Sequence, residues 1–61
     1  MSNKTQAIDA FNEACSLVEG MRELLEALEG SPNPPEKALY AMVRLSWEAC
    51  ARLEQAAALA R

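Results

Sequence analysis

The chain has 61 residues, of which 51% are hydrophobic, and a formal net charge of −3 at pH 7. A chain this short forms one domain at most, and a core of this size seldom supplies more than about 3–5 kcal/mol without a disulfide, a metal ion or self-association. There is no histidine, and the two cysteines, Cys15 and Cys50, lie far apart in the sequence. We therefore expect no metal site, no cofactor and no catalytic thiol, and no enzyme.

Hydropathy and charge argue against a membrane or a nucleic acid as a partner. No run of about 18 apolar residues could span a bilayer, and no apolar signal segment follows the polar start at residues 1–5. Residues 1–29 hold six acidic and two basic side chains, whereas residues 30–61 hold three acidic and four basic ones, without a basic cluster. We expect a cytoplasmic protein that binds neither membrane nor nucleic acid.

The first predicted helix runs from about residue 5 to residue 29. Its apolar residues recur every three or four positions, which indicates one long apolar stripe. The centre of the stripe is expected at Ala7, Phe11, Ala14, Val18, Met21, Leu25 and Leu28, and the stripe is widened on both sides by Ile8, Cys15, Leu17 and Leu24. A stripe of this width is typical of a helix with neighbours on two sides, as in a four-helix bundle.

A turn is predicted at residues 30–34. Gly30 can adopt the left-handed conformation that closes a helix, and the prolines that follow delay the next helix until Pro34 or Pro35. Asn33 and Glu36 have the spacing of a capping box, so Asn33 is expected to cap the second helix.

The second predicted helix runs from about residue 35 to residue 60. Its main apolar stripe is expected to contain Leu39, Met42, Val43, Ser46, Ala49, Cys50, Leu53, Ala56 and Ala57. Two helices of similar length joined by a short stiff loop pack as antiparallel neighbours. The sequence therefore predicts an all-α protein in which residues 1–61 form one antiparallel two-helix hairpin.

The width of the stripes predicts self-association. One hairpin is expected to leave Leu17, Leu24, Leu45 and Leu59 uncovered, so a second copy would complete a four-helix bundle. The residues expected in the core or the dimer interface are Phe11, Val18, Met21, Leu25, Leu28, Leu39, Met42, Val43 and Leu53. The antiparallel register brings Cys15 level with Cys50, either as two buried thiols or as a disulfide pair.

A second face of the second predicted helix carries Tyr40, Arg44, Trp47 and Ala51. Tyr40 is the only tyrosine and Trp47 the only tryptophan of the chain. Tyrosine, tryptophan and arginine are the residue types that most often anchor protein interfaces. This face is therefore expected to bind a different protein or to pack in the homodimer interface, and the residue types do not distinguish the two.

The patterns at residues 10–18 and 38–43 resemble those of short two-helix proteins of proteobacteria and their phages. Some small phage proteins of this shape are dimeric hairpins that inhibit host regulators, so the resemblance implies a protein-binding role without transferring a site residue. The sequence leaves three hypotheses: a dimeric module that regulates or inhibits a partner, a purely structural oligomerisation element, and a bundle that binds a small apolar ligand around Met21, Met42 and the alanine-rich end of the second helix.

Overall fold

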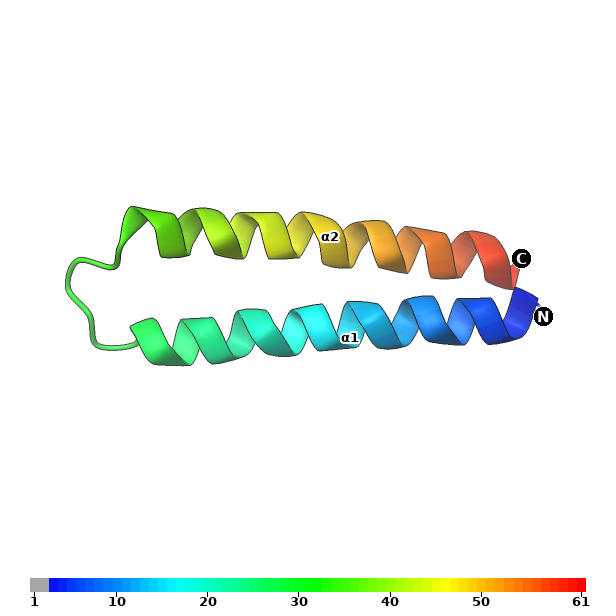
Figure 1. The fold of residues 1–61 in the computed structure, drawn as a ribbon, viewed down its shortest axis with the longest axis horizontal. Coiled ribbons are helices and arrows are strands. Elements are labelled where there is room, and N and C mark those ends of the chain that lie inside the picture. The colour runs from blue at the N-terminus through cyan, green and yellow to red at the C-terminus, as the bar shows by residue number, and fades with distance from the viewer. Residues whose placement is uncertain (1–2) are drawn as a thin grey trace.

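The computed structural model describes residues 3–61 as two long helices that lie side by side (Figure 1). Helix α1 spans Asn3–Leu28, and helix α2 spans Glu36–Ala60. The hairpin measures 47 × 15 × 14 Å, with the turn at one end and both ends of the chain at the other. The all-helical, two-helix arrangement predicted from the sequence is confirmed. We call the end that holds the turn the turn end, and the opposite end the open end.

The turn is built by one glycine and one proline. Gly30 has a φ of +83°, the left-handed region that a side chain disfavours, and Ser31 N–H donates to the carbonyl of Leu28 at 3.0 Å. The N-cap of α2 is Pro35, in an extended conformation, and its carbonyl accepts the N–H of Ala38 at 3.0 Å. The capping box predicted at Asn33 is wrong, because α2 starts one residue after Pro35 and its N-cap makes no side-chain hydrogen bond.

The contact surface between the two helices, which we call the seam, is lined by small residues near the open end and by larger ones near the turn. Only Ala10, Ala14 and Ala49 are buried within residues 3–61. The half-buried seam residues are Ala7, Leu17, Met21, Leu24 and Leu28 on α1, and Ala38, Met42, Leu45, Ala56 and Leu59 on α2. These positions recur every three or four residues, as expected for two helices packed along their whole length.

The seam differs from the predicted centre of the apolar stripe. Phe11, Val18 and Leu25 were expected to face α2, but between 49% and 52% of each is exposed. Their places in the seam are taken by the residues one position earlier, Ala10, Leu17 and Leu24. The other four residues of the predicted centre do lie in the seam: Ala7, Ala14, Met21 and Leu28. Two alanines allow helices to approach more closely than two larger side chains, so α2 packs against the smaller side of the stripe.

The prediction that four leucines would remain uncovered by the hairpin is wrong for the same reason. Leu17, Leu24, Leu45 and Leu59 are all half-buried in the seam. The predicted stripe of α2 is divided in the same way: Met42, Ser46, Ala49 and Ala56 are buried or half-buried, whereas Leu39, Val43, Cys50, Leu53 and Ala57 are exposed. Each helix thus has a seam side and a second apolar side that the other helix does not cover.

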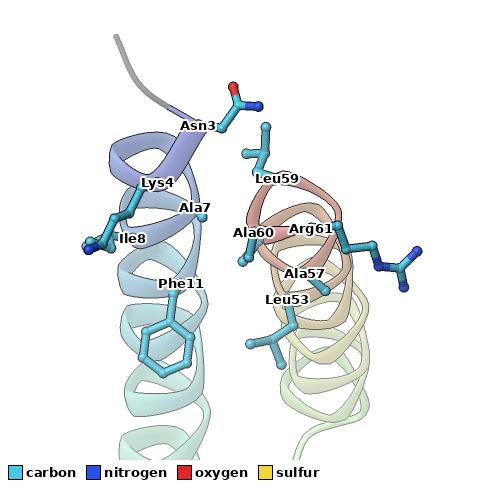
Figure 2. A pocket seen from close by; sticks show the side chains of 11 residues that line it. Asn3, Lys4, Ala7, Ile8, Phe11, Leu53, Ala57, Leu59, Ala60 and Arg61 are labelled. Atoms are coloured by element: carbon cyan, nitrogen blue, oxygen red, sulfur yellow. The ribbon is translucent and has the colours of Figure 1, made fainter.

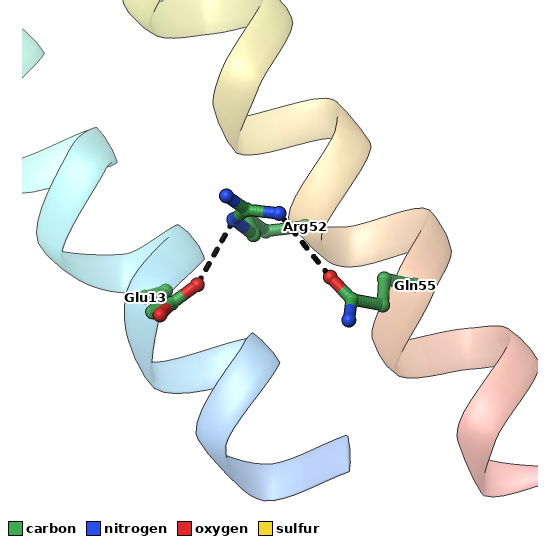
Figure 3. Close-up of polar contacts among 3 residues, drawn as sticks. All are labelled: Glu13, Arg52 and Gln55. Atoms are coloured by element: carbon green, nitrogen blue, oxygen red, sulfur yellow. Dashed lines mark hydrogen bonds and ion pairs between the residues drawn. The ribbon is translucent and has the colours of Figure 1, made fainter. Parts of the chain in front are cut away.

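One ion pair shows the register of the hairpin. The Nε atom of Arg52 lies 2.9 Å from the Oε2 atom of Glu13, and Arg52 also donates a hydrogen bond to Gln55 (Figure 3). Glu13 and Arg52 therefore lie at the same level of the two antiparallel helices. Residues of α1 and α2 whose numbers add up to about 65 share a level, which agrees with the predicted pairing of Cys15 with Cys50.

Candidate functional site

The candidate functional surface is one long side of the hairpin on which large apolar residues are exposed. We call it the apolar face. It contains Ile8, Phe11, Cys15, Val18 and Leu25 on α1, and Leu39, Val43, Cys50, Leu53 and Ala57 on α2. The seven largest of these, from Ile8 to Leu53, each expose between 43% and 52% of their surface. A contiguous apolar surface of this length is uncommon on a monomeric protein and marks an interaction site.

The two helices turn these residues to the same side for a geometric reason. All residues of the apolar face except Leu53 follow a buried or half-buried seam position by one residue, as Val18 follows Leu17 and Leu39 follows Ala38. One step along an α-helix is a rotation of about 100° in a fixed sense, so two antiparallel helices that face each other carry such residues to the same long side. The apolar face is therefore a direct consequence of the position of the seam.

Shallow hollows on the surface confirm that the two helices share this face. The largest, about 800 Å³, lies at the open end between Ile8 and Phe11 of α1 and Leu53 and Ala57 of α2 (Figure 2). A second hollow lies between Val18 and Leu53, and a third between Leu25 and Leu39 near the turn. The apolar face thus runs from one end of the hairpin to the other.

The opposite long side is polar and is called the polar face. It carries Gln6, Glu13, Glu48, Arg52 and Gln55, all exposed. The ion pair between Glu13 and Arg52 lies here (Figure 3). Charged residues usually remain in water, so the polar face is suited to solvent and the apolar face to a partner.

The predicted partner-binding residues lie on the outward side of α2. Tyr40 and Trp47 expose 63% and 68% of their surface, and Arg44 and Ala51 are exposed as well. The hydroxyl of Tyr40 donates to Glu36 at 3.2 Å, which orients the ring along the helix. The seven-residue spacing brings both rings to the same side of α2, with Arg44 between them in the sequence.

Trp47 borders the apolar face without belonging to it. It follows Val43 by four residues and precedes Cys50 by three, so these three residues are neighbours on the surface of α2. Val43 and Cys50 belong to the apolar face, whereas Trp47 points away from α1. We call Tyr40, Arg44, Trp47 and Ala51 the aromatic surface.

The two cysteines are not buried as predicted. Cys15 and Cys50 are both free and both exposed, and each lies on the apolar face. Each follows a buried alanine, Ala14 or Ala49, by one residue, so the helical rotation carries both thiols away from the seam. The sequence correctly placed them at similar levels but did not show that they point out of the hairpin.

The residues predicted for the core or the dimer interface divide into two groups. Met21, Leu28 and Met42 are half-buried in the seam. Phe11, Val18, Leu25, Leu39, Val43 and Leu53 are exposed on the apolar face. The sequence signal that separates the two groups is the position of Ala10, Ala14 and Ala49, because the small residues define the side on which the helices meet.

The described residues offer no metal site and no membrane span. Among residues 3–61, the side chains of histidine, cysteine, aspartate and glutamate form no cluster of three that could hold a metal ion. Neither α1 nor α2 is apolar enough along its length to cross a bilayer. The three parts of the predicted ligand site do not come together in one hollow: the alanine-rich end of α2 lines the hollow at the open end, Met42 lines the one near the turn, and Met21 lines none of the three.

Comparison of the chain with protein families, curated proteins and solved structures gave no match.

Proposed function

We propose that this chain is a small protein-binding module that works as a homodimer and has no catalytic activity. Two hairpins pair through their apolar faces and form a four-helix bundle. The observation that carries the proposal is the exposure of large side chains such as Phe11, Val18 and Leu25, each about half exposed, on a single continuous face. Covering this face removes apolar surface from water, which favours association by about 25 cal/mol for each square ångström buried.

The aromatic surface is the proposed contact with a different protein. The dimer covers the apolar face and leaves the outward side of α2 accessible, so Tyr40 and Trp47 flank the bundle. Two aromatic rings with an arginine in the same sequence segment have the composition of an interface hot spot. We propose that the bound protein is regulated or inhibited by the module, in agreement with the resemblance to phage hairpin proteins, and that this takes place in the cytoplasm.

Self-association is tested by sedimentation equilibrium at micromolar concentration. The intact chain should give the mass of a dimer, and Val18→Glu should give a monomer because it brings a carboxylate into the centre of the apolar face. Ser16→Glu adds the same charge two residues away on the polar side, where Ser16 lies beside Glu13 and Arg52, and should leave the dimer intact. A monomeric mass for the unaltered chain would contradict the proposal.

The role of the aromatic surface is tested separately. Trp47→Ala should leave the dimer and its helicity unchanged but abolish capture of a partner from host lysate, with Glu48→Ala on the polar face of the same helix as the control. If Trp47→Ala dissociates the dimer, the aromatic surface belongs to the dimer interface. If the chain captures no other protein, it is a structural oligomerisation element.

The hollow at the open end favours the ligand-binding alternative in one respect. It is mostly apolar and has a volume of about 800 Å³, which falls in the range of about 300–1,000 Å³ for small-molecule sites. It is also an open stretch of the apolar face, so a second copy would fill it. A co-purifying apolar molecule that shifts the protein from dimer to monomer would support the ligand-binding bundle instead.

A further inference from the structure

The two ends of the apolar face carry opposite charges. At the open end, the hollow between the helices is lined by Lys4 and Arg61 and by no acidic residue (Figure 2). At the turn end, the hollow is lined by Glu26 and Glu29 together with Arg22, and Arg22 is already paired with Glu26 at 3.8 Å. The face therefore changes from basic to acidic along its length.

The size of the side chains also changes from one end to the other. On α2, the turn end of the apolar face presents Leu39 and Val43, which are 44% exposed, whereas the open end presents Ala57 and Ala60. Large side chains pack well opposite small ones, because the two surfaces then interdigitate at interior density. On α2, large side chains lie opposite small ones when the turn end of one hairpin packs on the open end of a second copy.

We propose that the second copy docks on the apolar face reversed end for end, so that α1 packs on α1 and α2 packs on α2 of the second copy. The proposal rests on the proposed function, since it specifies how the two hairpins of the dimer pair. The two-fold axis lies in the interface between the two copies, perpendicular to the helices. On α1 it passes at the level midway between Cys15 and Val18. On α2 it passes at the level midway between Ser46 and Cys50.

This axis brings together complementary positions of the two copies. On α1, Lys4 meets Glu29 of the second copy, and Ile8 meets Leu25. On α2, Leu39 meets Ala57 of the second copy, Val43 meets Leu53, and Glu36 lies next to Arg61. The same axis satisfies both helices because their levels are linked through the pairing of Glu13 with Arg52.

The alternative is a dimer in which both hairpins point the same way. That arrangement would bring Lys4 and Arg61 of the two copies together at one end, and Glu29 and Glu36 together at the other. Like charges held close together at an interface disfavour association, whereas opposite charges favour it and fix the orientation. The two arrangements bury the same face, so charge and side-chain size decide between them.

The apolar face is large enough for a stable dimer. A standard protein interface takes about 800 Å² from each partner. The hairpin exposes 4801 Å² in total. One long side of a particle 47 Å long and 15 Å wide has a projected area of about 700 Å² before the relief of the side chains is counted. The face therefore supplies an area of the required size.

Disulfide cross-linking tests the orientation directly. Cys15→Ala and Cys50→Ala remove the native thiols, and Lys4→Cys and Glu29→Cys are then added singly or together. The reversed dimer predicts a covalent dimer for the double variant and none for either single variant, because residue 4 meets residue 29 of the second copy. Positions 4 and 29 lie at opposite ends of α1, so they cannot link within one chain.

Charge reversal tests the same orientation with the native cysteines in place. Glu26→Lys with Glu29→Lys changes the net charge from −3 to +1, which reduces the overall repulsion between copies. The reversed dimer nevertheless predicts dimerisation weaker by about 5- to 30-fold, since the lysine at position 29 then meets Lys4 of the second copy. Adding Lys4→Glu changes the net charge to −1 and restores opposite charges at positions 4 and 29, so the affinity should return to within about threefold of the original.

The outcomes separate this inference from the proposed function. A monomeric unaltered chain contradicts both. A dimer that cross-links through Lys4→Cys alone contradicts only the reversed orientation, and so does a dimer in which the lysine variants of Glu26 and Glu29 bind more tightly. A dimer that links in neither the single nor the double variants overturns the proposed axis.

Discussion

The seam and the apolar face differ in a way that is unusual for a small protein. The seam, which the hairpin buries by itself, contains alanines at its most buried positions, Ala10, Ala14 and Ala49. The apolar face, which the hairpin leaves in water, contains Phe11, Leu25 and other large residues. A self-sufficient domain places its largest apolar residues inside, where each contributes most to stability. The comparison shows that the seam positions the helices, and it supports the proposal that a larger core forms when a second copy covers the apolar face.

Phe11→Ala is the strongest test of whether the apolar face is part of a core. We expect it to lower the free energy of unfolding by about 2–4 kcal/mol, because in the dimer Phe11 is covered by the second copy. In a monomer the same residue is about half exposed, and its loss would cost about 1 kcal/mol or less. Urea unfolding at several protein concentrations provides the measurement, and Asn12→Ala, one residue further on and exposed, is the control. A small, concentration-independent loss would show that the apolar face is not part of a core.

Ala14→Leu tests whether the two helices pack closely at the seam. Ala14 is 1% exposed, so three additional carbon atoms would force α1 and α2 apart. We expect a loss of about 1–3 kcal/mol in unfolding free energy, as for other overpacked sites. Ala58→Leu makes the same change at an exposed position of α2 and should be nearly neutral. If Ala14→Leu raised the thermal midpoint, the seam would contain unfilled space and the close approach of the helices would be incorrect.

The sequence predicted the hairpin but not the division of its apolar residues. Periodicity, Gly30 and the prolines were sufficient for two helices and a turn. The predicted centre of the stripe combines residues of both surfaces, since Ala14 and Met21 lie in the seam whereas Phe11 and Val18 lie on the apolar face. Hydrophobic periodicity finds the middle of a wide stripe, whereas the contact between two helices depends on how closely their backbones approach.

The sequence predicted only part of the candidate site. Tyr40 and Trp47 were recognised because aromatic residues at a seven-residue spacing stand apart from the stripe, and both are exposed. The exposure of Cys15 and Cys50 was missed because each follows a buried alanine by one residue. The uneven charge along the apolar face was also missed, since Lys4 and Arg61 come from opposite ends of the sequence and line the same hollow only in the folded hairpin.

Two glycine substitutions test whether the hairpin and the apolar face are independent, because both change the hairpin at positions outside the apolar face. At Gly20 an added Cβ would meet no atom within 4 Å, so Gly20→Ala should stabilise α1 by up to about 1 kcal/mol. Gly30 has a positive φ, and Gly30→Ala should destabilise the turn by about 1 kcal/mol. Thermal unfolding should show opposite shifts, and sedimentation should show the same dimer. A change in mass for either variant would show that the hairpin and the interface are not separable.

The smallest expected effect concerns the ion pair between Glu13 and Arg52 on the polar face. The atoms are 2.9 Å apart, but both side chains are about half exposed or more, so the coupling free energy should be only about 0.2–1 kcal/mol. A double-mutant cycle with Glu13→Gln and Arg52→Gln measures it, and the coupling should decrease as salt is raised because exposed charges are screened. Since the pair lies on the side that the proposed dimer leaves in water, neither substitution should change the dimer affinity. A loss of affinity in both variants would place the interface on the polar face and would reverse the roles of the two long sides.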